Sequence, residues 1–384
     1  MTDQNQVQES PRAEVQIALV GGQNIPIYIG VLERQPTTIH LFCTQQSQAN
    51  AEILKKMFSR AECRIQHIDH GKILNIKKKI IDIIKMIDGP VEINLTGGTK
   101  MMALAAYEAA RQTNSRAFYV DGRRDLLTWV PEGNDEELQC SLSTEDYFKL
   151  QGHEDPKSGQ DIKSYDEIVW AQLREARKLY YNPKMIKLRS KFIKDFRGEY
   201  RDRIDIIVSD NLSCRWNKGL FKLKLADNEY LFEGKEIFEM LMSGAYLEYE
   251  ISEKIQEKAG QYTDAQHSYR VGFNHSQSSS LEKNEIDMLV NLGRRLVFIE
   301  CKAGRVLAKD VDKISNVRRK YGGEYALSIL VCSASGISKE REEQCRDTAI
   351  TVLKYQIDYK TRLINQSDLR KLPELLLKLK KFEL

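Results

Sequence analysis

Long apolar runs, paired cysteines and a strong charge of either sign are all missing from this 384-residue sequence. No run approaches the ~20 residues of a membrane-spanning helix, and the polar N-terminus, MTDQNQVQESPRAE, has no hydrophobic signal core. The seven cysteines are scattered and no CxxC occurs, so neither a disulfide framework nor a zinc site is indicated. The net charge is only +4, so any affinity for nucleic acid must come from local basic patches. These absences favour a cytoplasmic protein with reduced thiols and no membrane contact.

The first 150 residues instead alternate between short apolar runs and helical stripes. Strands are expected at 15–20, 39–43, 64–68, 91–95, 117–120 and 126–130, and helices at 49–60, 73–87 and 101–113. This alternation predicts a parallel, doubly wound α/β sheet. Ligands of such sheets bind at the carboxyl ends of the strands.

One loop at that edge, TGGTK, is chemically distinctive. Gly97 and Gly98 let the backbone approach a ligand closely, and the helix that follows offers free N–H groups and the positive end of its dipole. Thr96 and Thr99 add hydroxyls and Lys100 adds a charge, a set that suits a phosphate or a nucleotide. The spacing is not that of a Walker loop, so ATP hydrolysis is not indicated. The alternative is a glycine-rich turn in which Thr99 caps the helix.

A β-hairpin is expected at 285–302, with arms at 285–291 and 296–302. Its two-residue turn has Gly293 in the first central position. This turn fixes the register, pairs Met288 with Ile299, and sets the apolar side chains of both arms on one face. The residues expected on that face are Ile286, Met288, Val290, Leu292, Val297, Ile299 and Cys301.

The same register sets Asp287 directly opposite Glu300, with Lys302 on the same face two residues further on. Two carboxylates opposed across a ladder repel one another unless positive charge lies between them. A hard cation such as Mg²⁺ needs one or two carboxylates and keeps waters for a substrate. Lys302 could orient the attacking water or stabilise charge on a phosphate. This D…ExK pattern is typical of metal-dependent phosphodiester cleavage. A solvated hairpin face with alternating charges is the alternative.

Three segments of the chain resemble a known family. NLTGGTKMMALAAYEAA resembles the signature of CRISPR-associated Rossmann-fold (CARF) sensor domains, which bind cyclic oligoadenylates, and LVGGQNIPIYIG resembles their first ligand loop. NEIDMLV…LVFIECKAG resembles the PD-(D/E)xK nuclease core fused to such sensors. The similarity is to CARF-nuclease effectors that are activated by cyclic tetraadenylate and cut single-stranded nucleic acids.

The resemblance implies roles for individual residues. Gln23 would lie at the first ligand loop, Thr44 at the end of the second strand, and the TGGTK loop would hold phosphate and ribose. The implied catalytic core is Asp287, Glu300 and Lys302, with an acidic residue from a preceding helix in the position of Glu248. Asp287, Glu300 and Glu248 would bind Mn or Mg.

The helix that carries Glu248 also has an apolar stripe. Leu247, Ile251 and Ile255 recur at the spacing of a core-packed helix face. On this spacing we expect Glu248 near the core boundary and Glu250 to point away from the core.

The expected organisation is a CARF-like domain at 1–150, a linker at 151–163, and a restriction-endonuclease-like α/β domain at 164–384 with a helical and stranded N-terminal extension. The implied function is a metal-dependent endonuclease of single-stranded RNA and/or DNA, activated by cyclic oligoadenylate in type III CRISPR antiviral defence. Two alternatives remain open: a regulator that binds nucleic acid without cutting it, and a hydrolase whose sensor domain cuts its own ligand. Because a cyclic oligoadenylate is rotationally symmetric, we expect a homodimer with the ligand on its axis.

Overall fold

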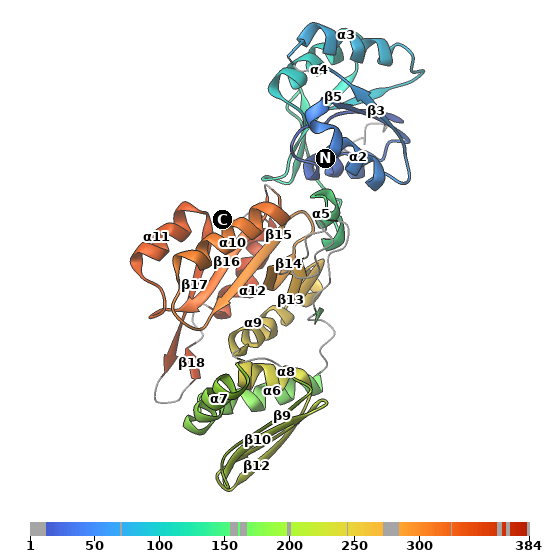
Figure 1. The fold of residues 1–384 in the computed structure, drawn as a ribbon. Coiled ribbons are helices and arrows are strands. Elements are labelled where there is room, and N and C mark those ends of the chain that lie inside the picture. Colours follow the sequence, from blue (N-terminus) through green and yellow to red (C-terminus); the bar gives the residue numbers. More distant parts are fainter. Residues whose placement is uncertain are drawn as a thin grey trace, which may run out of the picture.

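The computed structural model describes residues 13–69, 71–153, 160–161, 167–197, 201–243, 245–271, 284–323, 325–358, 363–365 and 369–381. They form two α/β units and a smaller four-stranded unit, which follow one another along the length of the molecule (Figure 1). All seven cysteines are free thiols. Among the described residues, every helix is too short or too polar to span a bilayer.

The N-terminal unit is a seven-stranded sheet in the order β3-β2-β1-β4-β5-β6-β7. Its strands are β1 (Val15–Leu19), β2 (Thr38–Cys43), β3 (Glu62–His67), β4 (Val91–Asn94), β5 (Arg116–Asp121), β6 (Leu126–Val130) and β7 (Asp135–Glu137). Strands β1 to β5 run parallel, and β6 and β7 are added antiparallel. Its helices are α1 (Ile25–Arg34), α2 (Gln48–Met57), α3 (Ile73–Ile84), α4 (Lys100–Thr113) and α5 (Thr144–Leu150).

Both faces of this sheet are covered, as the sequence predicts for a doubly wound fold. Ile17 and Leu19 of β1 pack in one core with α3 and α4, whereas Ala18 and Val20 pack in another with α1 and α2. Helix α1 was missed by the sequence analysis. Its residues 25–31 are all buried, so it has no polar face from which a helical period could be recognised.

The C-terminal unit is a mixed sheet in the order β18-β17-β16-β15-β14-β13-β8. Its strands are β8 (Gln160–Asp161), β13 (Asp264–Val271), β14 (Asn284–Asn291), β15 (Leu296–Lys302), β16 (Leu327–Ser333), β17 (Ile350–Asp358) and β18 (Leu363–Asn365). The β13–β15 strands are antiparallel, and β15 to β17 are parallel. Its helices are α9 (Tyr246–Gln256), α10 (Ala308–Tyr321), α11 (Lys339–Asp347) and α12 (Leu372–Lys381). Helix α9 packs on one face and α10 on the other.

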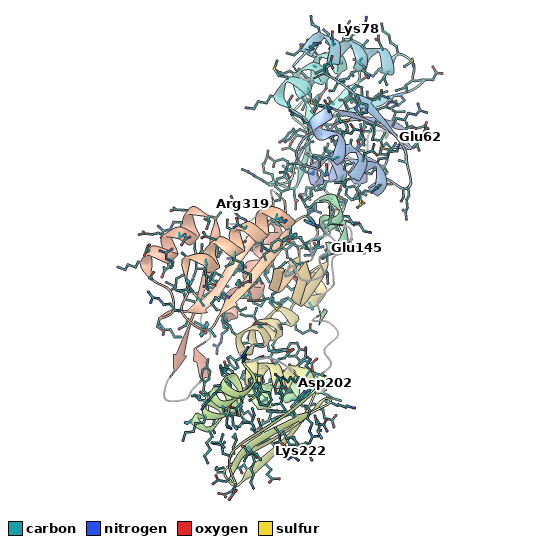
Figure 2. All side chains as sticks on the ribbon, viewed as in Figure 1. Glu62, Lys78, Glu145, Asp202, Lys222 and Arg319 are labelled. Carbon is teal, nitrogen blue, oxygen red and sulfur yellow. The ribbon has the colours of Figure 1, made fainter. Side chains whose placement is uncertain are left out.

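The third unit is an antiparallel meander of β9 (Arg203–Ser209), β10 (Leu212–Asn217), β11 (Leu220–Leu225) and β12 (Asn228–Glu233). Helices α6 (Glu167–Tyr180), α7 (Pro183–Phe196) and α8 (Lys235–Phe238) lie between it and the C-terminal sheet (Figure 1). Trp216 of the meander and Ile299 of β15 belong to one continuous core. In Figure 2, Asp202 and Lys222 mark this unit, and Glu145 marks α5 at the junction of the two α/β units.

Candidate functional site

The predicted β-hairpin forms with the predicted register. Met288 pairs with Ile299, and the backbone N–H of Leu292 donates to the carbonyl of Arg295 across the turn at 3.0 Å. Gly293 has a φ of 102°, the left-handed conformation that the first central position of this turn requires. The turn therefore sets which residues of the two strands lie side by side.

Asp287 is fixed by its side chain as well as by its strand. The β14–β15 pairing runs from Asn291–Leu296 to Met288–Ile299, and beyond it Asp287 Oδ2 accepts a 2.7 Å hydrogen bond from the backbone N–H of Cys301. The expected alternation is wrong at Ile286, which packs in the core of Leu289 and Phe298 on the other face. The strand departs from regular alternation here, where a side-chain bond follows the end of the ladder.

The charges of two other carboxylates, Glu300 and Glu248, act on Asp287. Burial raises the pKa of Asp287 well above its usual range, and the nearby charges of Glu300 and Glu248 raise it further. The hydrogen bond from Cys301 and the charge of Lys313 act in the opposite direction without offsetting the rise. Burial and the neighbouring carboxylates thus both favour the protonated form of Asp287.

Two lysines hold Glu300, which is only 5% exposed. Nζ of Lys302 lies 2.9 Å and Nζ of Lys313 3.1 Å from its Oε1, and Lys302 also lies 3.7 Å from Asp310. Burial lowers the pKa of Lys302, but the charge and hydrogen bond of Glu300 and the charges of Asp287 and Asp310 leave it raised. Lys302 therefore stays protonated beside the carboxylates.

Lys313 is a member of this site that the sequence pattern does not single out. It reaches Glu300 from α10, thirteen positions further along the chain. The sequence places Lys313 in a basic segment of an expected helix, but only the packing of α10 against β15 brings it to the carboxylate. A D…ExK pattern alone cannot identify it.

Helix α9 supplies Glu248, and its apolar stripe is confirmed, since Leu247, Ile251 and Ile255 are at most 2% exposed. The expectation that Glu250 points away from the core is wrong. Glu250 is 2% exposed and forms an ion pair with Arg177 of α6. Helix α6 covers that side of α9, and this long-range contact is invisible in the spacing of α9 itself.

The chemistry of these oxygen donors fits a hard divalent cation. In the described part of the chain, no three His, Cys, Asp or Glu side chains are placed so that they form a metal-binding group. Mg²⁺, however, needs only one or two carboxylates and retains several waters. Asp287 and Glu300 provide that number, and a cation there would offset the charges of Glu300 and Glu248 that, after burial, raise the pKa of Asp287.

The TGGTK loop lies at the carboxyl end of β4, as predicted, but several of its groups are engaged within the fold. Thr96 Oγ1 accepts a 2.8 Å hydrogen bond from the backbone of Val120, and Thr99 Oγ1 caps α4 by accepting one from Met102 at 3.3 Å. The helix cap expected in the alternative interpretation is therefore present. Lys100 is exposed, and no ion pair of its side chain occurs among the described residues.

The two glycines of the loop allow its backbone to pack closely against neighbouring parts of the same chain. A Cβ on Gly97 would overlap the carbonyl oxygen of Leu19, and Gly98 has a φ of 74°. A Cβ on Gly21 would lie 2.9 Å from the backbone nitrogen of Gly98, so the first ligand loop lies directly against the TGGTK loop. Asn50 of α2 donates to the carbonyl of Gly21 at 2.7 Å and fixes this arrangement.

The other two predicted ligand residues lie at the same edge of the sheet. Gln23 is exposed in the loop that follows β1. Thr44 directly follows β2 and is 7% exposed, and its backbone N–H donates to Ser47 Oγ at 3.1 Å. Because β1 lies between β2 and β4, the three loops line one edge at the point where the strand order reverses.

Comparisons with known proteins identify the N-terminal unit. Residues 15–147 match the family model of the Card1 CARF domain. No curated protein matches the chain.

Solved structures share the fold over nearly the whole chain. The structure of Can2 from Sulfobacillus thermosulfidooxidans in complex with cyclic tetra-adenylate has a TM-score of 0.68 at 16% identity, over 95% of this chain and 99% of that one. The protein VC1899 from Vibrio cholerae has a TM-score of 0.73 at 16% identity, over 96% and 98%. A type III CRISPR defence DNA nuclease activated by cyclic oligoadenylate has a TM-score of 0.54 at 17% identity, over 88% of this chain and 52% of that one. At these identities the similarity is one of fold.

Proposed function

We propose that this chain is a divalent-metal-dependent endonuclease that cleaves single-stranded RNA and/or DNA and is activated by cyclic oligoadenylate, with cyclic tetraadenylate as the activator. Its place would be the cytoplasm, in type III CRISPR antiviral defence. The observation that carries the proposal is the cluster of Asp287, Glu300, Glu248 and Lys302 in the same chain as a CARF domain. The similarity in fold to a cyclic tetra-adenylate complex and to a nuclease activated by cyclic oligoadenylate supports it.

At the nuclease site, Asp287 and Glu300 would hold the metal ion, with Glu248 as a further acidic group. Such an ion lowers the pKa of a bound water and offsets charge on a phosphate. Asp287 is held in place by the N–H of Cys301, and Glu300 by two lysines. Lys302 keeps its proton on Nζ, so it can stabilise negative charge that develops on the phosphate during cleavage.

At the sensor site, the edge of the sheet offers an exposed lysine and a helix start. Lys100 and the N-terminus of α4 would face the phosphates of the activator. Gln23 and Thr44, from the neighbouring loops, would contact the same ligand. Thr96 and Thr99 would act mainly by holding the loop in shape, because their hydroxyl groups already bond within the fold.

One experiment tests the proposal. Purified protein is incubated with labelled single-stranded RNA and DNA, in Mn²⁺ or in EDTA, with and without cyclic tetraadenylate. We expect cleavage only when the metal ion and the activator are both present. Binding of nucleic acid without cleavage would support the regulator instead, and loss of the activator without cleavage would support a hydrolase that cuts its own ligand.

A further inference from the structure

The tip of the hairpin that carries the carboxylates contacts the CARF domain. At its tip, the carbonyl of Gly293 accepts a 2.7 Å hydrogen bond from the backbone N–H of Leu142. Asn291, which is fully buried, donates through Nδ2 to the carbonyl of Leu142 at 2.8 Å. The turn of the hairpin is thus bonded to the segment that leads into α5.

Arg294 adds a two-pronged ion pair across the same junction. Its Nε lies 2.8 Å from Oδ1 of Asp125, its Nη2 donates to Oδ2 at 2.8 Å, and its Nη1 donates to the carbonyl of Cys140 at 2.7 Å. The two side chains are 21% and 15% exposed, so water screens this pair far less than a surface pair. Two hydrogen bonds from the one guanidinium, to Oδ2 of Asp125 and to the carbonyl of Cys140, join the hairpin tip to two segments of the N-terminal unit.

Arg295 reaches the turn that joins β5 to β6. It is 8% exposed, and its Nη2 lies 3.3 Å from the carbonyl oxygens of Gly122 and Arg123. Burial lowers the pKa of Arg295 to about 10. Gly122 leaves no room for a side chain, because a Cβ there would overlap the ring of Tyr325 in the C-terminal unit. The β5–β6 turn is therefore in close contact both with the hairpin, through Arg295, and with the segment before β16, through Tyr325.

Strand β5, which leads into this turn, is bonded to the loop proposed to bind the activator. Thr96, the first residue of TGGTK, accepts its hydrogen bond from Val120, two residues before Gly122. In the other direction, the chain passes from Arg295 into β15 and reaches Glu300 after five residues, or about 16 Å of extended strand. One strand thus joins the junction to the carboxylate site.

The junction also has room to change. A cavity of about 830 Å³ opens beside the Arg294–Asp125 pair and separates β6 and β7 from α12. Arg124, Glu137, Glu374 and Lys378 are among its lining residues. The charged walls and open space on this side of the junction leave room for its side chains to rearrange.

We propose that Arg294 and Arg295 are the positioning residues through which the CARF domain controls the carboxylate site. The route runs from the TGGTK loop through Val120 and the β5–β6 turn to the hairpin tip, and along β14 and β15 to Asp287 and Glu300. This inference rests on the proposed function and names how that function is regulated. Because two sites coupled in this way influence each other equally, metal bound at Asp287 would change the affinity for the activator by the same factor.

The test compares the full-length protein with Arg294→Ala and Arg294→Lys, and with Arg124→Ala as the matched control. Arg124 lies on the β5–β6 turn that the hairpin tip contacts, but its ion pair with Asp135, at 3.2 Å, is largely exposed. Three measurements are made with cyclic tetraadenylate: affinity by calorimetry, activator-dependent cleavage, and amide hydrogen exchange of residues 286–301. If Arg294→Ala unfolds at a different temperature from the parent in the absence of ligand, the comparison is made with Arg294→Lys, which keeps the positive charge.

We expect Arg294→Ala to bind the activator as the parent does in the absence of metal. The factor by which the activator increases the cleavage rate should be about tenfold smaller in this variant than in the parent, a typical size for coupling between sites. The exchange response of the hairpin should disappear as well, and Arg294→Lys should restore part of it. The proposal is overturned if hydrogen exchange of the hairpin responds to the activator equally in the parent and in Arg294→Ala. It is also overturned if hydrogen exchange of the hairpin in the parent does not respond to the activator at all. If the parent does not cut nucleic acid, the proposed function fails. The comparison of hydrogen exchange between the parent and Arg294→Ala still tests whether Arg294 couples the activator site to the hairpin.

Discussion

At the scale of single residues, Asp287 and Glu300 differ in how their charge is balanced. Glu300 is held by Lys302 and Lys313, whereas Asp287 is buried beside two further carboxylates and its pKa is raised. The repulsion between the carboxylates therefore acts mainly on Asp287, where it adds to the effect of burial in favouring the protonated form. The opposed pair inferred from the sequence is not symmetric.

We expect Asp287→Asn to abolish cleavage and to raise the metal-free stability at neutral pH. Because the folded-state pKa of Asp287 lies above its unfolded value of about 3.9, the folded protein binds more protons between the two values, and stability falls as pH rises through that window. An asparagine keeps an oxygen that can accept the Cys301 N–H. The gain should be on the order of 1 kcal/mol and shrink as the pH approaches about 4. Thermal unfolding of both proteins in EDTA across this range measures it, and a less stable variant at pH 7 would contradict the assignment.

The reverse effect on stability is expected for Glu300→Ala. This variant should also be inactive, but it leaves Lys302, which is 29% exposed, without its nearest carboxylate. Removing one partner of a buried ion pair costs about 3–5 kcal/mol when the remaining charge is fully buried, and less here because Lys302 is partly exposed. Urea unfolding in EDTA should therefore give a lower free energy of unfolding for Glu300→Ala than for the parent. Retained cutting by this variant and by Asp287→Asn would refute the site.

Lys100 gives the cleanest test of the sensor loop, because its side chain is exposed and makes no ion pair within the described residues. A hydrogen bond to a charged group contributes about 1.5–3 kcal/mol, so Lys100→Ala should raise the Kd for cyclic tetraadenylate about tenfold or more. Lys78→Ala, an exposed lysine of α3 marked in Figure 2, is the control and should bind as the parent does. Unchanged affinity in Lys100→Ala by calorimetry would mean that the loop is only a turn.

The residues predicted from the sequence are those fixed by local geometry. A two-residue turn sets the register of the hairpin, so the pairing of Met288 with Ile299 follows from a short stretch of sequence. Lys313 reaches Glu300 and Arg177 reaches Glu250 because helices cross strands and other helices. No spacing within either segment carries that information.

At the scale of elements, the TGGTK loop is shaped by packing against β1. Gly97 has no space for a Cβ because of the Leu19 carbonyl and the Ile27 side chain, whereas nothing lies within 4 Å of the same position at Gly22. We expect Gly97→Ala to lower the free energy of unfolding by about 1–3 kcal/mol, the usual cost of overpacking. Gly22→Ala, in the adjoining loop, should be neutral or slightly stabilising. Urea unfolding of the two variants compares them directly, and equal stability would show that the loop can move away from β1.

Elements with a clear period were predicted, and elements without one were not. The helix expected at 101–113 forms as α4, whereas α1 is buried on nearly all sides and gives no helical period. Strand β8 is two residues long and lies within the segment expected to be a linker, so only its pairing with β13 defines it. Residues 154–159 and 162–163 of that segment lie outside the described residues.

At the scale of the whole molecule, the chain places its two candidate sites at opposite ends of one hairpin. The tip of the hairpin contacts the CARF domain, and Asp287 and Glu300 lie toward the opposite ends of β14 and β15. Phe298 of β15 and Phe148 of α5 belong to the same core. The two α/β units are therefore linked by a buried apolar core as well as by polar contacts.

The last prediction concerns assembly. Helices α3 and α4 carry exposed apolar side chains close to the TGGTK loop, with Leu104 56% exposed and Leu74 76% exposed. A rotationally symmetric ligand is matched by a two-fold site that presents this loop twice, so we expect a homodimer with one cyclic tetraadenylate bound per two chains. Burying a leucine contributes about 1.5–3 kcal/mol, and a two-fold interface counts it twice. Leu104→Glu should therefore weaken the dimer and the binding of the activator together.

Leu231→Glu in the four-stranded unit, where the leucine is 61% exposed, is the matched control and should leave the dimer unchanged. Light scattering gives the mass of each protein in solution, and calorimetric titration gives the number of ligands per chain. A parent protein that is monomeric at micromolar concentration, or that binds one ligand per chain at saturation, would exclude a shared site on the axis. Control of the carboxylates would then have to arise within a single chain, through the hairpin tip alone.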